Sequence, residues 1–159
     1  MKIENVIDDV YSILENSHKV SQDNLNDLLT GVSTVLTSAL EEARRNSRTK
    51  LRMSSIGKKD RRLWFELKHP KEESMPSGPT LIKFLYGSLL EEVLLFLVKE
   101  AGHDVTDMQK KVTISGVDGH MDCKIDGEIV DVKTASDFSF KKFVNGTLFN
   151  KDSFGYLAQ

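Results

Sequence analysis

The chain of 159 residues is 39% hydrophobic and 29% charged, with a formal net charge of −2. This length can bury the core of one domain, and the near-neutral charge neither indicates nor excludes a nucleic-acid partner, because local patches matter more than the total. The one cysteine, Cys123, excludes an internal disulfide and any cysteine-rich metal or iron–sulfur site built by this chain alone.

The sequence contains neither a membrane-spanning run nor a signal peptide. No stretch reaches the roughly 18 uninterrupted apolar residues that a spanning helix needs. The N-terminus lacks the charged-then-apolar layout of a secretory signal. We therefore expect a soluble cytoplasmic protein with no membrane partner.

Two amphipathic helices are predicted in the first 40 residues. Apolar residues recur at helical spacing over residues 3 to 16. Ser21 is suited to cap a second, longer helix, whose apolar residues run from Leu25 to Leu40. We expect these helices to form a hairpin domain, residues 1–48, which serves oligomerisation or pairs with a complementing polypeptide.

A long apolar helix is predicted within residues 80 to 102, after a loop rich in proline and charge. Pro79 lies near its start and Gly102 just past its end. Apolar residues occupy almost every face, so we expect a buried central helix. Glu91 lies among apolar neighbours, whereas Glu92 shares its stripe with polar residues and can reach solvent. Because a buried carboxylate is costly unless it is paired or metal-bound, Glu91 is the candidate functional acid.

Three β-like runs follow, over residues 104–114, 119–125 and 128–134. Asp126-Gly127 separates the last two and is typical of a tight hairpin turn. Counting outward from this turn places Asp122 opposite Asp131 and His120 opposite Lys133. The other face carries the apolar residues Met121, Cys123, Ile125, Val130 and Val132, and so resembles a core.

The opposed aspartates predict a metal site. Like charges directly opposite each other are destabilising, so Asp122 and Asp131 must share a proton or a cation. A hard divalent ion with oxygen ligands meets this need, and Lys133 then reaches a phosphate or a water at that ion. Two alternatives stay open. One is a solvated salt-bridge face, and the other is a calcium loop, although its acids are spaced by four residues where the EF-hand has two.

The order of these motifs resembles the PD-(D/E)XK nuclease superfamily, particularly its RecB-type and phage-exonuclease branches. YGSLLEE, in which Glu91 follows Gly87 by four residues, is similar to the first motif of that group. GHMDCKI resembles the second, with Asp122, and IVDVKTAS the third, with Asp131 and Lys133.

Two more segments carry the resemblance, which covers residues 52 to 159. RMSSIGKKDRRLWFE is similar to the R-x-S-x-x-G-x-C-x-R-x-L-W segment of RecB-like exonucleases. Lys59 stands where that segment has a cysteine, so no iron–sulfur cluster is expected. GYLAQ resembles the last motif of the family, in which Tyr156 and Gln159 approach DNA or brace the site.

The resemblance implies a fold and an activity. The expected fold is α/β (α+β), a restriction-endonuclease-like core over residues 49–159 with a central mixed β-sheet flanked by helices, apparently truncated at its C-terminus. The expected activity is metal-dependent hydrolysis of DNA by an exonuclease of phage, recombination or repair type, in the host cytoplasm if a phage encodes it. The alternatives are a restriction-like endonuclease and a catalytically silent module that binds DNA or protein.

The resemblance also implies roles for particular residues. Asp122 and Asp131 bind Mg²⁺, or Mn²⁺ in its place, with Glu91 as a further ligand and the Val132 carbonyl completing the shell. Lys133 orients or helps to deprotonate the attacking water. The expected DNA-binding residues are Arg52, Ser54, Ser55, Arg61, Arg62, Trp64, Tyr156 and Gln159. For the basic segment the alternative is a helix with a solvated basic face and Trp64 in the core.

Overall fold

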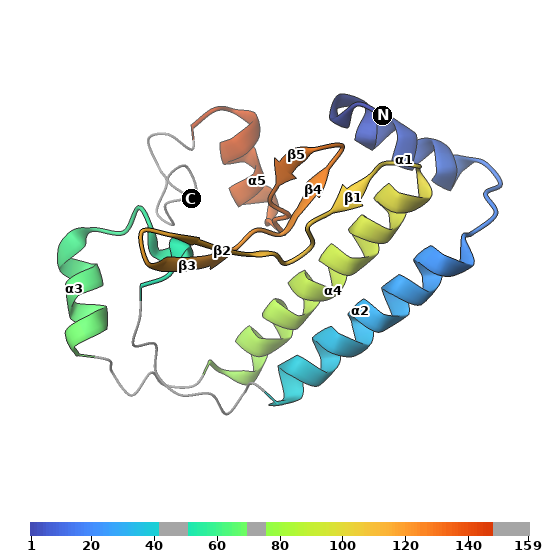
Figure 1. The fold of residues 1–159 in the computed structure, drawn as a ribbon. Helices are drawn as coiled ribbons and strands as arrows, with labels where there is room; N and C mark the ends of the chain where they lie inside the picture. Colours follow the sequence, from blue (N-terminus) through green and yellow to red (C-terminus); the bar gives the residue numbers. More distant parts are fainter. Residues whose placement is uncertain (42–50, 70–75, 148–159) are drawn as a thin grey trace. The chain divides into compact units, whose positions relative to one another are not determined.

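The computed structural model describes residues 1–41, 51–69 and 76–147. The chain forms two compact units. Figure 1 shows the helices and strands from which they are built. The described part of unit 1 comprises residues 1–41, 76–110 and 121–133, and that of unit 2 comprises residues 51–69, 111–120 and 134–147. None of the described helices combines the length and the apolar character needed to cross a membrane.

Unit 1 contains the helices that the sequence predicts near its N-terminus and in its middle. The 3-10 helix η1 spans Ile3–Asn5, and the helices α1, α2 and α4 span Val6–Glu15, Gln22–Glu41 and Gly78–Glu100. Both α1 and α2 pack against α4. The backbone carbonyl of Ser21 accepts from Leu25, so the second helix begins where its predicted cap lies. The proposed division into domains at residue 48 stays a prediction.

The core of unit 1 gathers at the C-terminal half of α4. Leu95 and Val98 are buried there together with Cys123 and Ile125. The residues packed around them are Ile3, Val6, Val10, Val105, Val130 and Val132. Four of the five residues of the apolar face predicted for the hairpin, Cys123, Ile125, Val130 and Val132, thus lie in or against this core, whereas Met121 does not belong to it.

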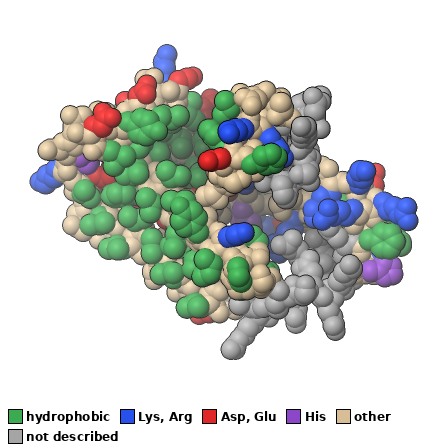
Figure 2. Space-filling model, turned by 180° about the vertical axis from the view of Figure 1, so that it is seen from behind, with side chains coloured by type: hydrophobic (Ala, Val, Ile, Leu, Met, Phe, Trp, Pro, Cys, Tyr) green, Lys and Arg blue, Asp and Glu red, His purple; other side chains and the backbone are tan. Residues whose placement is uncertain are grey.

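The prediction that α4 is buried along its whole length is wrong. Ile82, Phe84 and Tyr86 are 64%, 61% and 62% exposed. The core lies against one side of the C-terminal half of the helix, so Ile82, Phe84 and Tyr86 stay at the surface, and Val93 and Leu94 are also exposed. Figure 2 shows hydrophobic side chains gathered over the helical face of unit 1.

The first sheet contains the hairpin predicted around Asp126-Gly127. Strands β1 (Val105–Thr106), β4 (Cys123–Ile125) and β5 (Glu128–Val130) form an antiparallel sheet of order β1-β4-β5. Cys123 pairs with Val130 and Ile125 with Glu128, which confirms the predicted register. Asp126 and Gly127 both have positive φ, 51° and 90°, as a type I′ turn requires.

The other predicted runs are divided differently. Residues 104–114 form β1 and a separate strand β2, Lys111–Ile114, because Asp107 and Gln109 adopt left-handed φ values of 53° and 50° that interrupt the ladder. The strand β2 pairs with β3, Val117–His120, within unit 2. The described strands therefore form two small antiparallel sheets, and the expected central mixed sheet is not found among them. The fold class is α+β.

Unit 2 contains short elements around the β2–β3 hairpin. They are the 3-10 helix η3 (Met53–Ser55), α3 (Asp60–Lys68) and α5 (Asp137–Val144). Arg52 forms an isolated parallel bridge with Asp118, and Met53 lies so close to Gly119 that a side chain there would collide with it. Ser136 caps α5 through its hydroxyl, which accepts from the Ser139 amide.

Candidate functional site

The two aspartates approach each other where the β4–β5 ladder ends. The last paired residues are Cys123 and Val130, so the residue just before β4 and the residue just after β5 are both aspartates. The Val132 amide donates a hydrogen bond of 2.8 Å to Asp122 Oδ2. This bond fixes the Asp122 carboxylate over the backbone that carries Asp131, as the register predicts.

Burial and neighbouring charge act together on Asp122. Desolvation raises the pKa of its carboxyl above the ordinary value, and the adjacent Asp131 carboxylate raises it further. The hydrogen bond from Val132 and the charge of Lys133 act in the opposite direction without cancelling the increase. The negative charge at Asp122 is therefore poorly compensated by the protein.

Helix α4 contributes a third acid to this cluster. Desolvation raises the pKa of the half-buried Glu91, and the charge of Asp122 raises it further. Lys133 acts on the same carboxyl by lowering its pKa. The sequence-predicted acids Glu91, Asp122 and Asp131 and the predicted lysine thus share one region of unit 1, and we refer to these four residues as the acidic cluster.

Lys133 contacts the most exposed of these acids. Its Nζ lies 2.6 Å from Asp131 Oδ1, and the two side chains are 42% and 62% exposed. Because solvent screens an exposed pair, this contact adds little to the stability of the fold. The lysine is therefore held at the edge of the cluster by a contact that costs little to rearrange.

The donor chemistry of the acidic cluster fits a hard divalent cation. Three carboxylates and the Val132 carbonyl offer oxygen atoms, which Mg²⁺ and Mn²⁺ prefer. Desolvation, and to a smaller extent the charge of a neighbouring carboxylate, raises the pKa of Glu91 and that of Asp122, and a cation would stabilise the ionised form of both groups. Within the described residues, however, no group of three or more histidine, cysteine, aspartate or glutamate side chains is arranged to hold a metal ion.

Gln109 is a residue of this site that the sequence did not indicate. Its side-chain amide donates to Glu91 Oε1 at 2.8 Å, and its backbone amide donates to the Asp122 carbonyl at 2.8 Å. It thereby links α4 to the segment before β4. A lone glutamine in a β-like run carries no signal for such a role, because the role depends on a left-handed φ of 50° at this position.

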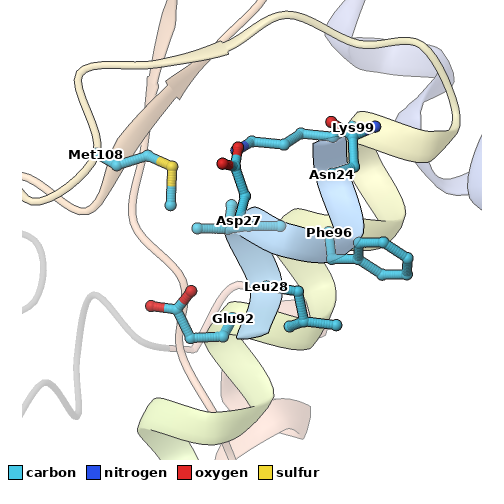
Figure 3. A pocket seen from close by; sticks show the side chains of 8 residues that line it. Asn24, Asp27, Leu28, Glu92, Phe96, Lys99 and Met108 are labelled. Carbon is cyan, nitrogen blue, oxygen red and sulfur yellow. The ribbon is translucent and has the colours of Figure 1, made fainter. Parts of the chain in front are cut away.

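Glu92 lies on a different side of α4 from its neighbour. Its carboxylate lies against Gly31 of α2, and burial raises the pKa of this carboxyl. It lines a small hollow, partly open to solvent, beside Asp27, Leu28 and Lys99 (Figure 3). Glu92 is partly exposed at this open hollow, in agreement with the prediction that it can reach solvent, and the helix directs its two adjacent glutamates to separate surroundings.

The predicted DNA-binding residues that are described lie in unit 2. Arg52 precedes η3, which contains Ser54 and Ser55, and α3 contains Arg61, Arg62 and Trp64. Tyr156 and Gln159 lie outside the described residues. His120 pairs with Lys111 in the β2–β3 hairpin, so the prediction that it pairs with Lys133 is wrong.

Comparisons with protein-family models, with curated proteins and with solved structures found no match to this chain.

Proposed function

We propose that this protein is a metal-dependent deoxyribonuclease that degrades DNA from its ends. The acidic cluster carries this proposal, because it places Lys133 beside opposed aspartates and a helix glutamate in one unit. That combination suits phosphodiester hydrolysis, in which negative charge must be stabilised and a water activated. The resemblance of the motifs to RecB-type exonucleases supports the exonuclease form.

The residues that would hold the ion are Asp122, Asp131, Glu91 and the carbonyl of Val132. A bound Mg²⁺ or Mn²⁺ would supply stabilisation of phosphate charge and a lowered pKa of its water. Val132 holds the Asp122 carboxylate in place through its amide, and Gln109 does the same for Glu91. Lys133 would leave its contact with Asp131. It would then orient the attacking water and offset the negative charge of the phosphate.

A second candidate is a catalytically silent module that binds DNA or a protein. It is favoured by the arrangement of the acids, since the described residues hold no metal-ligating group of three. In that case Lys133 keeps its ion pair with Asp131, and the acidic cluster is a solvated salt-bridge surface.

Digestion of linear and of closed circular DNA, each with Mg²⁺ and with chelator, separates these functions. Metal-dependent loss of linear DNA alone supports the exonuclease. Cutting of the circle would indicate a restriction-like endonuclease with the same residues. If both substrates stay intact in Mg²⁺ and in Mn²⁺, while the protein is folded, the proposed hydrolysis is wrong and the silent module is supported.

A further inference from the structure

Helix α3 carries an exposed group of rings on the surface of unit 2. Trp64 is 52% and Phe65 47% exposed. The Trp64 and Phe65 ring centroids lie 5.0 Å apart with the planes at 89°, and the Phe65 and His69 centroids lie 5.6 Å apart. We refer to Trp64, Phe65 and His69 as the aromatic platform.

The platform is not a part of the core. Leu63 and Leu67, four residues apart, are the partly buried apolar positions of α3 and define its inner side. Trp64 and Phe65 lie outside that side, so the alternative of a core tryptophan is contradicted. The two large rings are therefore accessible on one helix, where they could contact a partner that offers flat apolar groups.

The charge around the platform points to the kind of partner. Residues 58–69 contain five lysines or arginines against two acids. The Arg61 guanidinium lies 5.9 Å from the Phe65 ring centroid, in a cation–π contact. Figure 2 shows basic side chains gathered beside hydrophobic ones over α3. A partner must therefore offer flat apolar faces and negative charge together.

Single-stranded DNA offers both. Each of its bases has a free face that stacks on aromatic rings, and each of its phosphates pairs with a cation. Duplex DNA presents phosphates, but its base faces are covered by neighbouring bases. An apolar protein surface would leave the cations without counter-charges, at a cost in desolvation.

We propose that the aromatic platform binds single-stranded DNA by stacking bases on Trp64 and Phe65, with Arg61 at the phosphates. This rests on the proposed function and defines its substrate as a single-stranded or frayed end. It assigns to Phe65 a role that the motif resemblance does not include.

Trp64 is the only tryptophan of the chain, so its fluorescence reports directly on the platform. The full-length chain is titrated in chelator, without divalent metal, with an oligodeoxythymidylate of about 20 nucleotides and with a blunt duplex of the same length. We expect the single strand to quench Trp64 strongly and the duplex to quench it weakly. Added salt should weaken binding, because phosphate contacts release counterions.

Two matched variants keep the reporter in place. Phe65→Leu removes a ring of the platform, and Phe138→Leu removes a ring from α5 that is 75% exposed and also lies 5.1 Å from a cation, Lys142. We expect Phe65→Leu to weaken single-strand binding roughly 5- to 150-fold and Phe138→Leu to leave it unchanged. Trp64→Phe, read by anisotropy of a labelled oligonucleotide, should retain most of the affinity, whereas Trp64→Leu should lose it.

Three results would overturn the inference: no quenching by the single strand, equal quenching by the duplex, or equal losses in Phe65→Leu and Phe138→Leu. Circular dichroism of each variant shows whether it is folded. Binding and cleavage are measured apart, so the two proposals fail separately. Quenching in chelator without cleavage in Mg²⁺ contradicts the nuclease alone, and cleavage with unchanged binding in Phe65→Leu contradicts the platform alone.

Discussion

Gln109 donates a hydrogen bond of 2.8 Å from its side-chain amide to Glu91 Oε1, and so joins the strand segment to the helix at the acidic cluster. Its backbone amide holds the Asp122 carbonyl at the same time. One residue thus positions two acids that come from different elements. Partners of this kind orient metal ligands and are often worth 10–100-fold in metal affinity.

Replacing Gln109 tests this positioning role. We expect Gln109→Ala to raise the Mg²⁺ concentration for half-maximal cleavage roughly tenfold or more, because Glu91 loses the donor that orients it. Gln109→Gly removes the same donor but tolerates the left-handed φ, so it should be about 1 kcal/mol more stable than the alanine variant. If both variants need the same raised Mg²⁺ concentration but differ in stability, the lost hydrogen bond, and not backbone strain, causes the change in metal requirement. A metal requirement unchanged from wild type in both variants would contradict the role.

Lys133→Ala should abolish cleavage while leaving metal binding intact. A group that positions or deprotonates the attacking water contributes roughly 10²–10⁴-fold to the rate. Its loss should also leave stability nearly unchanged, since the pair with Asp131 is exposed to solvent. Single-turnover digestion together with calorimetric Mn²⁺ titration measures both effects. A variant that cuts as fast as wild type removes Lys133 from the mechanism.

Glu91→Gln should separate function from stability. Its raised pKa comes first from desolvation and then from the charge of Asp122, so the ionised form opposes folding at neutral pH. The glutamine keeps an oxygen for Gln109 and removes the charge, so we expect stability to increase by a few tenths of a kcal/mol after solvent screening. Metal affinity should fall. Glu92→Gln, on another side of α4, is the matched control and should bind metal as wild type does.

Glu100 links pH to the stability of unit 1. Its carboxylate is 2.7 Å from His18 Nε2, and it accepts from Asn24 Nδ2 at 2.7 Å and from the Ser21 amide at 3.1 Å. Desolvation acts to raise its pKa, but the donors Asn24, Ser21 and His18 together lower it below 4.5. Because the folded pKa is lowered, its stabilising contribution is present above about pH 4.5 and is lost as the pH falls through the folded value.

The variant Glu100→Gln isolates this contribution. We expect it to lose about 1 kcal/mol of unfolding free energy at pH 7, because partly buried donors lose a charged acceptor. Urea denaturation from pH 7 to pH 3 should show the difference between wild type and variant shrinking in acid. If the difference grows as the pH falls, the assigned network is wrong.

Cys123 should be inert in the folded chain. Its side chain is 0% exposed, and desolvation, with smaller contributions from Asp122 and Glu91, raises the pKa of its thiol to about 11. Few thiolates then exist at pH 8, and access is blocked as well. We expect an aromatic disulfide reagent to react at least roughly 100-fold more slowly than it does in urea. Fast labelling without denaturant would show that the core of unit 1 opens readily.

Local sequence patterns determined much of unit 1. Helical periodicity gave the approximate bounds of α1, α2 and α4, because side-chain spacing along a helix is a property of neighbouring residues. Asp126-Gly127 determined the turn and therefore the register that opposes Asp122 and Asp131, because both turn positions need positive φ. Counting residues outward from this turn was therefore enough to predict that the two aspartates of the candidate site are opposed.

Tertiary structure decided the remainder. The exposure of Phe84 depends on where the neighbouring elements end, and the opposite surroundings of Glu91 and Glu92 depend on which segments face each side of α4. The split of the predicted β-runs into two sheets depends on left-handed backbone at Asp107 and Gln109, where neither residue type demands it. Such features arise from contacts between segments far apart in the chain, and the spacing of neighbouring residues does not predict those contacts.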